Sequence, residues 1–257
     1  SIGKVELAET ASLFENLDNI GEKHHVSVPE GMEYFGQNFG LIYYETTLKG
    51  KYNASPMYVK NVHDFAEVYF DGEKKTSIDR TLYSVEGKTT LKDVIFKKKK
   101  GESSPFLMPA LSGERKIGVL VDTMGRVNYG GNMLDRKGIS DIYLGIQRLM
   151  NYDVWTLPLD NLDKLKYSSS VKKDEPVFLR GSFKTDSKAD CFIHLDGFNR
   201  GCVYINGFNL GRFWKVGPQK SLYIPGTLLK DENEIIVFNI GGYSKPTVSI
   251  TDKHNLG

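Results

Sequence analysis

The chain has 257 residues, 26% of them charged, and a formal net charge of +2, a length that suits two domains with cores of roughly 100 to 130 residues each. Because Lys and Arg are interspersed with Asp and Glu, we expect no nucleic acid partner. No segment approaches the ~18 apolar residues of a membrane span and no signal peptide is recognised, so we expect no membrane partner either.

Short β-rich runs bounded by Gly, Pro, Asn or Asp predict strands along almost the whole chain. In chain order they are Leu41–Leu48, Ala66–Phe70, Ile117–Val121, Val177–Phe183, Cys191–Leu195, Val203–Ile205, Ser221–Ile224 and Glu234–Phe238. The best helical candidate, Ile139–Met150, is interrupted by Gly145. Strands do not alternate with helices of 10 to 15 residues, which excludes a TIM barrel for this chain and favours all-β sandwiches.

One basic run, Lys97–Lys100, precedes the turn-rich string Gly101–Pro105. We therefore expect a solvated loop there rather than a phosphate-binding patch.

Two cysteines, Cys191 and Cys202, bear on the compartment. If Asp196-Gly197 formed a two-residue turn, the cysteines would lie opposite each other and could form a disulfide. Matching the apolar faces of the two strands instead needs a longer loop, 196–202, which separates them. We expect free thiols, a reducing compartment and a cytoplasmic protein.

An internal repeat appears when the chain is shifted by 135 positions. The shift places Leu48 on Phe183, Val68–Phe70 on Val203–Ile205, and Asp71-Gly72 on Asn206-Gly207. Both dipeptides accept positive φ at the two central positions of a type I′ turn, so each is predicted to close a hairpin. Repetition of one supersecondary unit indicates duplicated modules, which we expect to be two β-sandwiches of one type.

The second copy is short for a full sandwich, so residues 1–20 are the candidate to complete its sheet from a distance. The expected organisation is a lead-in segment over 1–30, a first sandwich over 31–165, a second sandwich over 166–250 and a tail over 251–257.

The segment between Gly201 and Pro225 predicts four features in order, which are a strand, an Asn-Gly turn, an aromatic string and a Gly-Pro loop. This order resembles the C-terminal end of family 35 glycoside hydrolases, the β-galactosidase family. The matching residues are Gly207, Leu210, Gly211, Arg212, Trp214, Gly217, Pro218 and Gln219. Residues 11–20 and 32–48 resemble the family's passage out of its catalytic domain and the first strand that follows. A further family string matches at Gly125, Arg126, Asn128, Tyr129 and Gly130.

The resemblance implies two galactose-binding-like jelly rolls that follow a TIM-barrel catalytic domain and support it. It places the two catalytic glutamates in that barrel, so we expect this chain alone to be inactive and to have the barrel of the same polypeptide as its partner. β-Galactosides are a further candidate partner, and no cofactor is expected.

The residues themselves point to no catalytic centre. A retaining glycosidase needs two carboxyl groups about 5 to 5.5 Å apart. The acidic candidates have an alternative interpretation as turn or cap residues; they are Glu33, Glu45, Asp122, Asp135 and Asp141. The histidines show no metal-ligand spacing with Cys or carboxylates, and no metal is expected; they are His24, His25, His63, His194 and His254.

Four residues remain as candidate substrate-binding residues, Tyr129, Arg212, Trp214 and Gln219, because aromatic rings stack on sugar C–H faces and planar polar groups bind hydroxyls. For Trp214 core or interface packing is favoured over sugar contact. Tyr129 is the better candidate, since it lies in a glycine-flanked loop over 125–131, where Arg126 is expected to be a structural residue that binds an acid or a carbonyl.

Two alternative functions stay open. The chain is then either an independent carbohydrate-binding module, with its site around Trp214, or a structural or interaction domain without a ligand. If the reading frame upstream encodes a barrel with two catalytic glutamates, the chain is the non-catalytic region of a β-galactosidase rather than either alternative.

Overall fold

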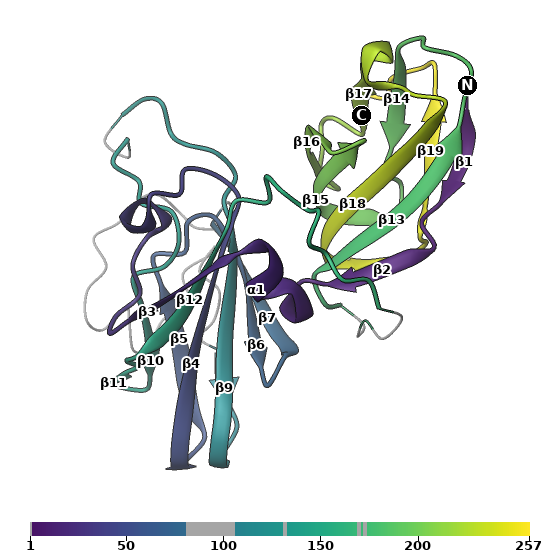
Figure 1. The fold of residues 1–257 in the computed structure, drawn as a ribbon. Helices are drawn as coiled ribbons and strands as arrows, with labels where there is room; N and C mark the ends of the chain where they lie inside the picture. Colours follow the sequence, from purple (N-terminus) through teal and green to yellow (C-terminus); the bar gives the residue numbers. More distant parts are fainter. Residues whose placement is uncertain (1, 81–105, 131–132, 169–170, 172–173) are drawn as a thin grey trace. The chain divides into compact units, whose positions relative to one another are not determined.

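The computed structural model describes residues 2–80, 106–130, 133–168, 171 and 174–257. The chain divides into two compact units, unit 1 over Ser1–Ile20 and Asp160–Gly257, and unit 2 over Gly21–Leu159. Both units are built of strands (Figure 1). The basic run Lys97–Lys100 lies outside the described residues.

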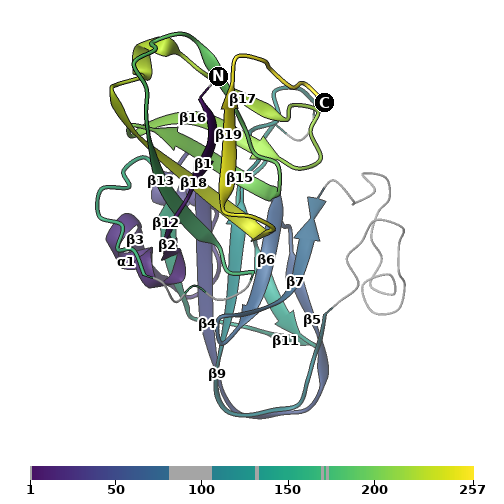
Figure 2. The same cartoon turned by 90° about the vertical axis from the view of Figure 1, so that its right-hand side faces the viewer.

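Unit 2 contains a six-stranded antiparallel sheet in the order β3-β12-β4-β9-β6-β7. Its strands are β3 (Glu22–Val26), β12 (Tyr152–Leu157), β4 (Leu41–Tyr52), β9 (Leu111–Asp122), β6 (Phe65–Phe70) and β7 (Glu73–Asp79). The two long strands, β4 and β9, run side by side over their whole length (Figure 1, Figure 2).

The second sheet of unit 2 has the order β11-β10-β5-β8. Its strands are β11 (Gln147–Arg148), β10 (Asp141–Leu144), β5 (Ser55–Lys60) and β8 (Phe106–Met108). Buried side chains from both sheets form one core, with Ile42 and Val119 from the larger sheet and Met57 and Ile142 from the smaller one. Unit 2 is therefore a β-sandwich.

Unit 1 is a second sandwich. Its five-stranded sheet has the order β16-β15-β18-β13-β2, and its four-stranded sheet has the order β1-β19-β14-β17. The strands are β1 (Gly3–Glu6), β2 (Glu9–Ser12), β13 (Val177–Lys184), β14 (Cys191–His194), β15 (Phe198–Ile205), β16 (Phe208–Trp214), β17 (Ser221–Ile224), β18 (Glu232–Tyr243) and β19 (Thr247–Thr251). Val203 and Val237 from one sheet share a core with Ile193 and Ile250 from the other.

Helical structure in the described residues is short. The helices are α1 (Leu17–Ile20), η1 (Phe14–Asn16), η2 (Met32–Phe35) and η4 (Gly226–Leu228). The prediction of an all-β fold with two sandwiches is confirmed, and so are the eight predicted strands.

The predicted hairpins are present at both turns. Asp71-Gly72 closes β6–β7 with φ of 48° and 78°, and Asn206-Gly207 closes β15–β16 with φ of 50° and 82°. Both hairpins shift register two residues before the end of the first strand, at Val68/Tyr69 and at Val203/Tyr204.

The turn residues also make the same bonds to the neighbouring strand. Asp71 donates its amide to the Lys116 carbonyl at 2.9 Å and accepts the Lys116 amide on Oδ1 at 2.9 Å. Asn206 exchanges the same two bonds with Glu234, at 3.0 and 2.9 Å. A duplicated module accounts for this agreement.

The strand orders extend the repeat to whole sandwiches. β12-β4-β9-β6-β7 corresponds to β2-β13-β18-β15-β16, and β11-β10-β5-β8 corresponds to β1-β19-β14-β17. The first strands of these matched orders differ in origin, because β12 and β11 come last in unit 2 whereas β2 and β1 begin the chain.

Residues 1–20 complete unit 1, as predicted. β1 pairs with β19, and β2 pairs with β13. The rest of the predicted lead-in belongs to unit 2, since β3 pairs with β12. The boundary at 165 also differs, because residues from Asp160 onward group with unit 1.

Two local segments differ from what the sequence suggested. The segment Ile139–Met150 is no helix: β10 and β11 form a hairpin there, with Gly145 at φ 59° and Ile146 97% exposed in the turn. The strands that carry Cys191 and Cys202 are no hairpin either, because β14 and β15 belong to different sheets. Alternation of apolar residues reports the buried face of a strand and does not identify its partner. Both cysteines are buried free thiols, as predicted.

Candidate functional site

The four predicted substrate-binding residues fall in different units. Tyr129 lies in unit 2, in the loop between β9 and β10, whereas Arg212, Trp214 and Gln219 lie in unit 1.

The loop that carries Tyr129 is anchored where it begins. Arg126 donates from Nη1 to Glu33 Oε1 at 2.6 Å and from Nη2 to the Asn38 carbonyl at 3.2 Å. The predicted structural role of Arg126 is thereby confirmed. Beyond this anchor Tyr129 is 88% exposed, and Leu134 further along is 93% exposed.

A buried charge cluster holds the other end of the loop. The Lys137 side chain is 2% exposed, and its Nζ lies 2.9 and 3.1 Å from the Asp64 carboxylate oxygens and 3.0 Å from Asp135 Oδ2. Arg80 Nη1 donates to the same two carboxylates. Two acids and two bases leave the cluster without formal net charge, so its burial is balanced by its own pairing.

Backbone amides complete the anchoring. Asp64 Oδ2 accepts the Met124 amide at 2.8 Å, at the start of the loop. Glu33 accepts the Lys137 amide at 3.0 and 3.1 Å, at its end. Bonds to Asp64 and Glu33 therefore fix the backbone on both sides of Tyr129, at Met124 and at Lys137.

These contacts keep the acids of the anchor ionised. Burial raises the pKa of Asp64, but the Met124 amide, Lys137 and Arg80 outweigh it, and its pKa lies below the usual value. The pKa of Asp135 is also lowered, because bonds from Arg80 and Lys137 exceed the opposing effect of burial.

Asp64 and Asp135 both contact one ammonium group, yet their chemistry does not suit glycoside hydrolysis. The acid/base carboxyl of a glycosidase needs a raised pKa so that it is protonated before it acts. The bonds of both carboxylates to Lys137 and Arg80, together with their lowered pKa, favour a structural role for this pair.

The carboxylates considered in the sequence have structural partners as well. Glu45 accepts from Lys116 at 2.9 Å, and Asp141 pairs with Arg148. Both acids lie inside strands, β4 and β10, so their interpretation as turn or cap residues was wrong. Within the described ranges, no group of three or more His, Cys, Asp or Glu side chains is arranged to hold a metal ion.

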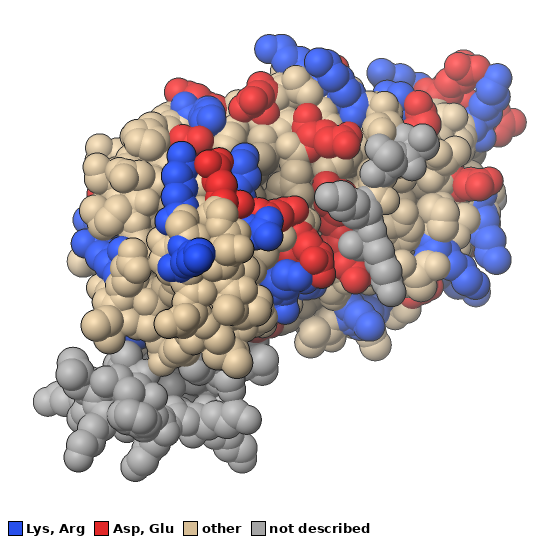
Figure 3. Space-filling model, turned by 90° about the horizontal axis from the view of Figure 1, so that it is seen from below, with Lys and Arg blue, Asp and Glu red and all other residues tan. Residues whose placement is uncertain are grey.

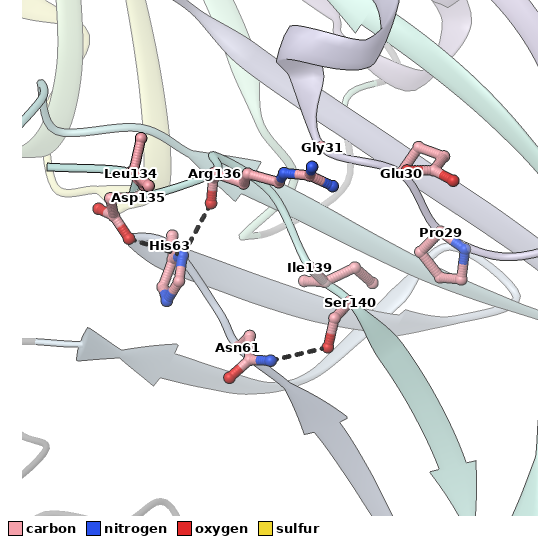
Figure 4. Close-up of a pocket in the computed structure, with 10 residues that line it drawn as sticks. All are labelled: Pro29, Glu30, Gly31, Asn61, His63, Leu134, Asp135, Arg136, Ile139 and Ser140. Carbon is pink, nitrogen blue, oxygen red and sulfur yellow. Dashed lines mark hydrogen bonds and ion pairs between the residues drawn. The ribbon is translucent and has the colours of Figure 1, made fainter. Parts of the chain in front are cut away.

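Next to the charge cluster lies a pocket of about 360 Å³ (Figure 4). Its lining residues, all in unit 2, are Pro29, Glu30, Gly31, Asn61, His63, Leu134, Asp135, Arg136, Ile139 and Ser140. His63 Nδ1 lies 2.7 Å from the Arg136 carbonyl and 2.9 Å from Asp135 Oδ1, which ties the pocket wall to the cluster.

In unit 1 the predicted aromatic residues alternate across β16. Phe213 is buried in the core of the sandwich, and its neighbour Trp214 is half-buried on the other face. There the Arg200 guanidinium lies 5.1 Å from the centre of the Trp214 ring. This cation–π contact favours packing for Trp214, as the sequence indicated.

The remaining candidates of unit 1 are exposed. Arg212 pairs with Cys202 across the β15–β16 ladder. Gln219 donates from Nε2 to the Ser221 carbonyl at 2.8 Å, so part of its bonding capacity is used within its own loop.

The surface carries charges of both signs. On the face drawn in Figure 3, Lys and Arg side chains lie among Asp and Glu side chains, as the small net charge of +2 suggests. None of the helices in the described part of the chain has the length and apolarity to cross a lipid bilayer.

Sequence reasoning missed the charge cluster and the pocket beside it. His63, Asp64, Arg80, Asp135 and Lys137 are spread over 75 positions and follow no motif. The one available signal in the sequence was a run of three charged residues, Asp135 to Lys137, directly before Gly138 and Ile139.

Comparison with known proteins assigns each unit to a family domain. The family model described as "Beta-galactosidase, first all-beta domain" matches residues 29–94 and 89–159, inside unit 2. The model described as "Beta-galactosidase, galactose-binding domain" matches residues 176–234, inside unit 1.

Curated relatives agree. A beta-galactosidase of Xanthomonas manihotis is 33% identical over 220 residues, which are 85% of this chain and 33% of the relative. Beta-galactosidase-1-like protein 2 of Homo sapiens is 34% identical over 96% of this chain and 37% of its own length. Beta-galactosidase 8 of Oryza sativa subsp. japonica is 31% identical over 93% of this chain and 40% of its own length.

The chain thus spans between a third and two fifths of the length of these relatives. Its two sandwiches each contain the match to one family domain. The chain therefore belongs to the β-galactosidase family, of the glycoside hydrolase family 35 type, and carries its non-catalytic first all-beta domain and galactose-binding domain.

Proposed function

We propose that this chain is part of a longer retaining β-galactosidase, and that its two sandwiches brace a TIM-barrel domain that hydrolyses terminal β-galactose. The relatives support this proposal, because each is about two and a half to three times as long as the segment that matches this chain. The lowered pKa of Asp64 and Asp135 is a further support, since neither acid suits proton donation in a glycosidase.

The proposal assigns the Tyr129 loop to the edge of the barrel's active-site mouth. The observation that carries it is the contrast between the fixed base of the loop and its exposed tip. An aromatic ring that is 88% exposed on a loop anchored at both ends is available for contact with a partner surface. Arg212, Trp214 and Gln219 remain candidates for substrate contact in unit 1.

The test compares Tyr129→Ser with the unchanged complete polypeptide. We expect kcat/KM for a β-galactoside to fall about 3- to 10-fold, the equivalent of one lost aromatic contact, with the unfolding transition unchanged. The matched control is Ile146→Ser, which also removes an exposed apolar side chain from a turn of unit 2. Equal kinetics for both variants, or a loss of stability confined to Tyr129→Ser, would overturn the role of the loop.

We also propose that the protein works in the cytoplasm. The support is chemical: Cys191 and Cys202 are both free thiols in a chain that forms no disulfide of its own. Asn53-Ala54-Ser55 offers a direct test, because this sequence accepts an N-linked glycan in secreted eukaryotic proteins and Asn53 is exposed next to β5. In protein from a eukaryotic source we expect unmodified Asn53 by mass spectrometry, and a glycan there would contradict the assignment.

A further inference from the structure

The pocket of unit 2 is separate from the four residues predicted to bind substrate, and it has the size of a small-molecule site. Its volume of about 360 Å³ falls at the lower end of the range for ligand pockets, roughly 300 to 1,000 Å³. The turn between β5 and β6, the segment before β10 and the segment around Gly31 form its walls (Figure 4).

His63 presents a ring nitrogen, Nε2, to this pocket. The Arg136 carbonyl, 2.7 Å from Nδ1, can only accept, so Nδ1 carries the proton. In the neutral imidazole Nε2 is then an acceptor, and Figure 4 shows this nitrogen on the side of the ring away from Asp135 and Arg136. Among the described residues, nothing bonds to Nε2.

Arg136 and Asn61 offer further polar groups to the pocket. The Arg136 guanidinium is exposed and has no partner among the described residues, and Figure 4 shows it directed along the wall toward Gly31. Asn61 donates to Ser140 Oγ at 3.0 Å, which leaves the Asn61 amide oxygen as a further acceptor. Acceptors and donors that converge from separate segments suit a ligand with several hydroxyl groups.

The pocket also has an apolar part. Ile139 and Pro29 are buried side chains in its lining, and the exposed side chain of Leu134 extends at its rim. Such surfaces suit the C–H faces of a sugar ring, whose edge carries the hydroxyls.

Charge decides between a neutral and an ionic ligand. The charges of Asp64 and Asp135 are balanced by Arg80 and Lys137. The two remaining charged groups of the pocket, Glu30 and Arg136, have opposite signs. An anion would be repelled by Glu30 and a cation by Arg136, so the lining favours a ligand without net charge.

We propose that this pocket binds a neutral polyhydroxylated ligand, one sugar unit of a carbohydrate, with His63 Nε2 and Arg136 as its polar contacts. The site goes beyond the proposed function, because it requires neither the barrel nor the Tyr129 side chain.

The experiment titrates the whole chain with galactose, glucose and lactose and follows its amide resonances by NMR. We expect at least one of these sugars to shift the resonances of residues around 61–63 and 136–140 in a saturable manner. No saturable shift up to 50 mM, or shifts confined to unit 1, would overturn the proposal. A response to acetate or sulfate without a response to the sugars would overturn the ligand class.

Variants test the two contacts. His63→Asn keeps a donor near the position of Nδ1 and removes Nε2, and Arg136→Met keeps the length of the side chain and removes its donors. We expect each to weaken sugar binding at least 10-fold while the amide spectrum elsewhere stays folded. The control Lys51→Ala removes an exposed charge on β4, outside the pocket, and is expected to bind as the unchanged chain does. Unchanged affinity in Arg136→Met, an exposed position where folding is not at stake, would overturn the proposal by itself.

Discussion

The two sandwiches share strand order, turn type and a register shift, yet they obtain the strands that flank β4 and β13 from opposite directions along the chain. In unit 2 the strand beside β4 is β12, which comes last, whereas in unit 1 the strand beside β13 is β2, which comes from the N-terminus. A sandwich of this kind therefore needs a strand at that position and does not depend on where in the chain the strand originates.

The units differ also in their loops. Unit 2 has a long connection between β9 and β10, anchored by buried charges. In unit 1 the equivalent connection, between β18 and β19, has three residues. The shared framework thus provides stability in both units, and the added loop of unit 2 carries the candidate sites.

The largest effect is expected from removing residues 1–12, which hold β1 and β2. Val5 and Leu7 are buried in the core of unit 1, and losing them alone costs about 4 to 10 kcal/mol, comparable with the whole stability of a domain. Unit 1 should unfold while the amide resonances of unit 2 keep their folded dispersion. The control Lys4→Ala, an exposed residue of β1, should leave both units folded. A folded unit 1 without residues 1–12 would show that its edge strands are dispensable.

A smaller effect, confined to unit 2, is expected from Lys137→Met. The substitution leaves Asp64 and Asp135 buried with Arg80 as their remaining basic side chain, and breaking such a buried pair costs about 3 to 5 kcal/mol. Urea denaturation followed separately for each unit measures this loss. As a control, Lys116→Met breaks the exposed pair with Glu45 and should cost about 0 to 1 kcal/mol. If both variants lose equally little, the cluster does not stabilise the loop base.

Within unit 1, comparing Phe213→Ala with Trp214→Ala distinguishes the stability contributed by the core face of β16 from that of its outer face. Phe213 is buried, so its loss should cost about 3 to 5 kcal/mol. Trp214 is half-buried over Arg200, and its loss should cost about 1 to 2 kcal/mol. Thermal unfolding of the two variants gives the ranking, and a larger loss for Trp214→Ala would reverse our assignment of the two faces.

The smallest effect is a difference in acid sensitivity. Asp64 and Asp135 have lowered pKa values in the folded state, so the unfolded state binds more protons as the pH falls. Their contribution is complete above the unfolded pKa of about 3.9 and is lost as the pH drops through the lower folded values. Between pH 5 and pH 3 the urea midpoint of unit 2 should therefore fall more than it does in Asp64→Asn/Asp135→Asn. An equal fall in both proteins would contradict the electrostatic account of the cluster.

Local signals in the sequence predicted the framework well. The dipeptides Asp71-Gly72 and Asn206-Gly207 determine their turns through backbone conformation, and the strand next to each follows from β-branched and aromatic residues. The candidate helix at 139–150 is a hairpin instead, because apolar residues on both of its short strands mimic helical spacing, and Ile146 is exposed in its turn.

The candidate sites were harder to predict because they depend on distant residues. The loop position of Tyr129 was predictable from its flanking glycines, and a structural role was expected for Arg126. Lys137 and Asp64 could not be paired from sequence, since their contact arises only when the β9–β10 loop folds back onto the start of β6. The strand partners of β14 and β15 were unpredictable for the same reason, because the chain passes from one sheet to the other between them.

Hydrolysis of a chromogenic β-galactoside by the purified chain tests most directly whether these two domains are non-catalytic. The account predicts no turnover above buffer, because the chain matches the non-catalytic domains of the family and the carboxylates of Asp64 and Asp135 are bonded to Lys137 and Arg80. Turnover that follows the chain through successive purification steps, at a constant rate per molecule, would contradict it.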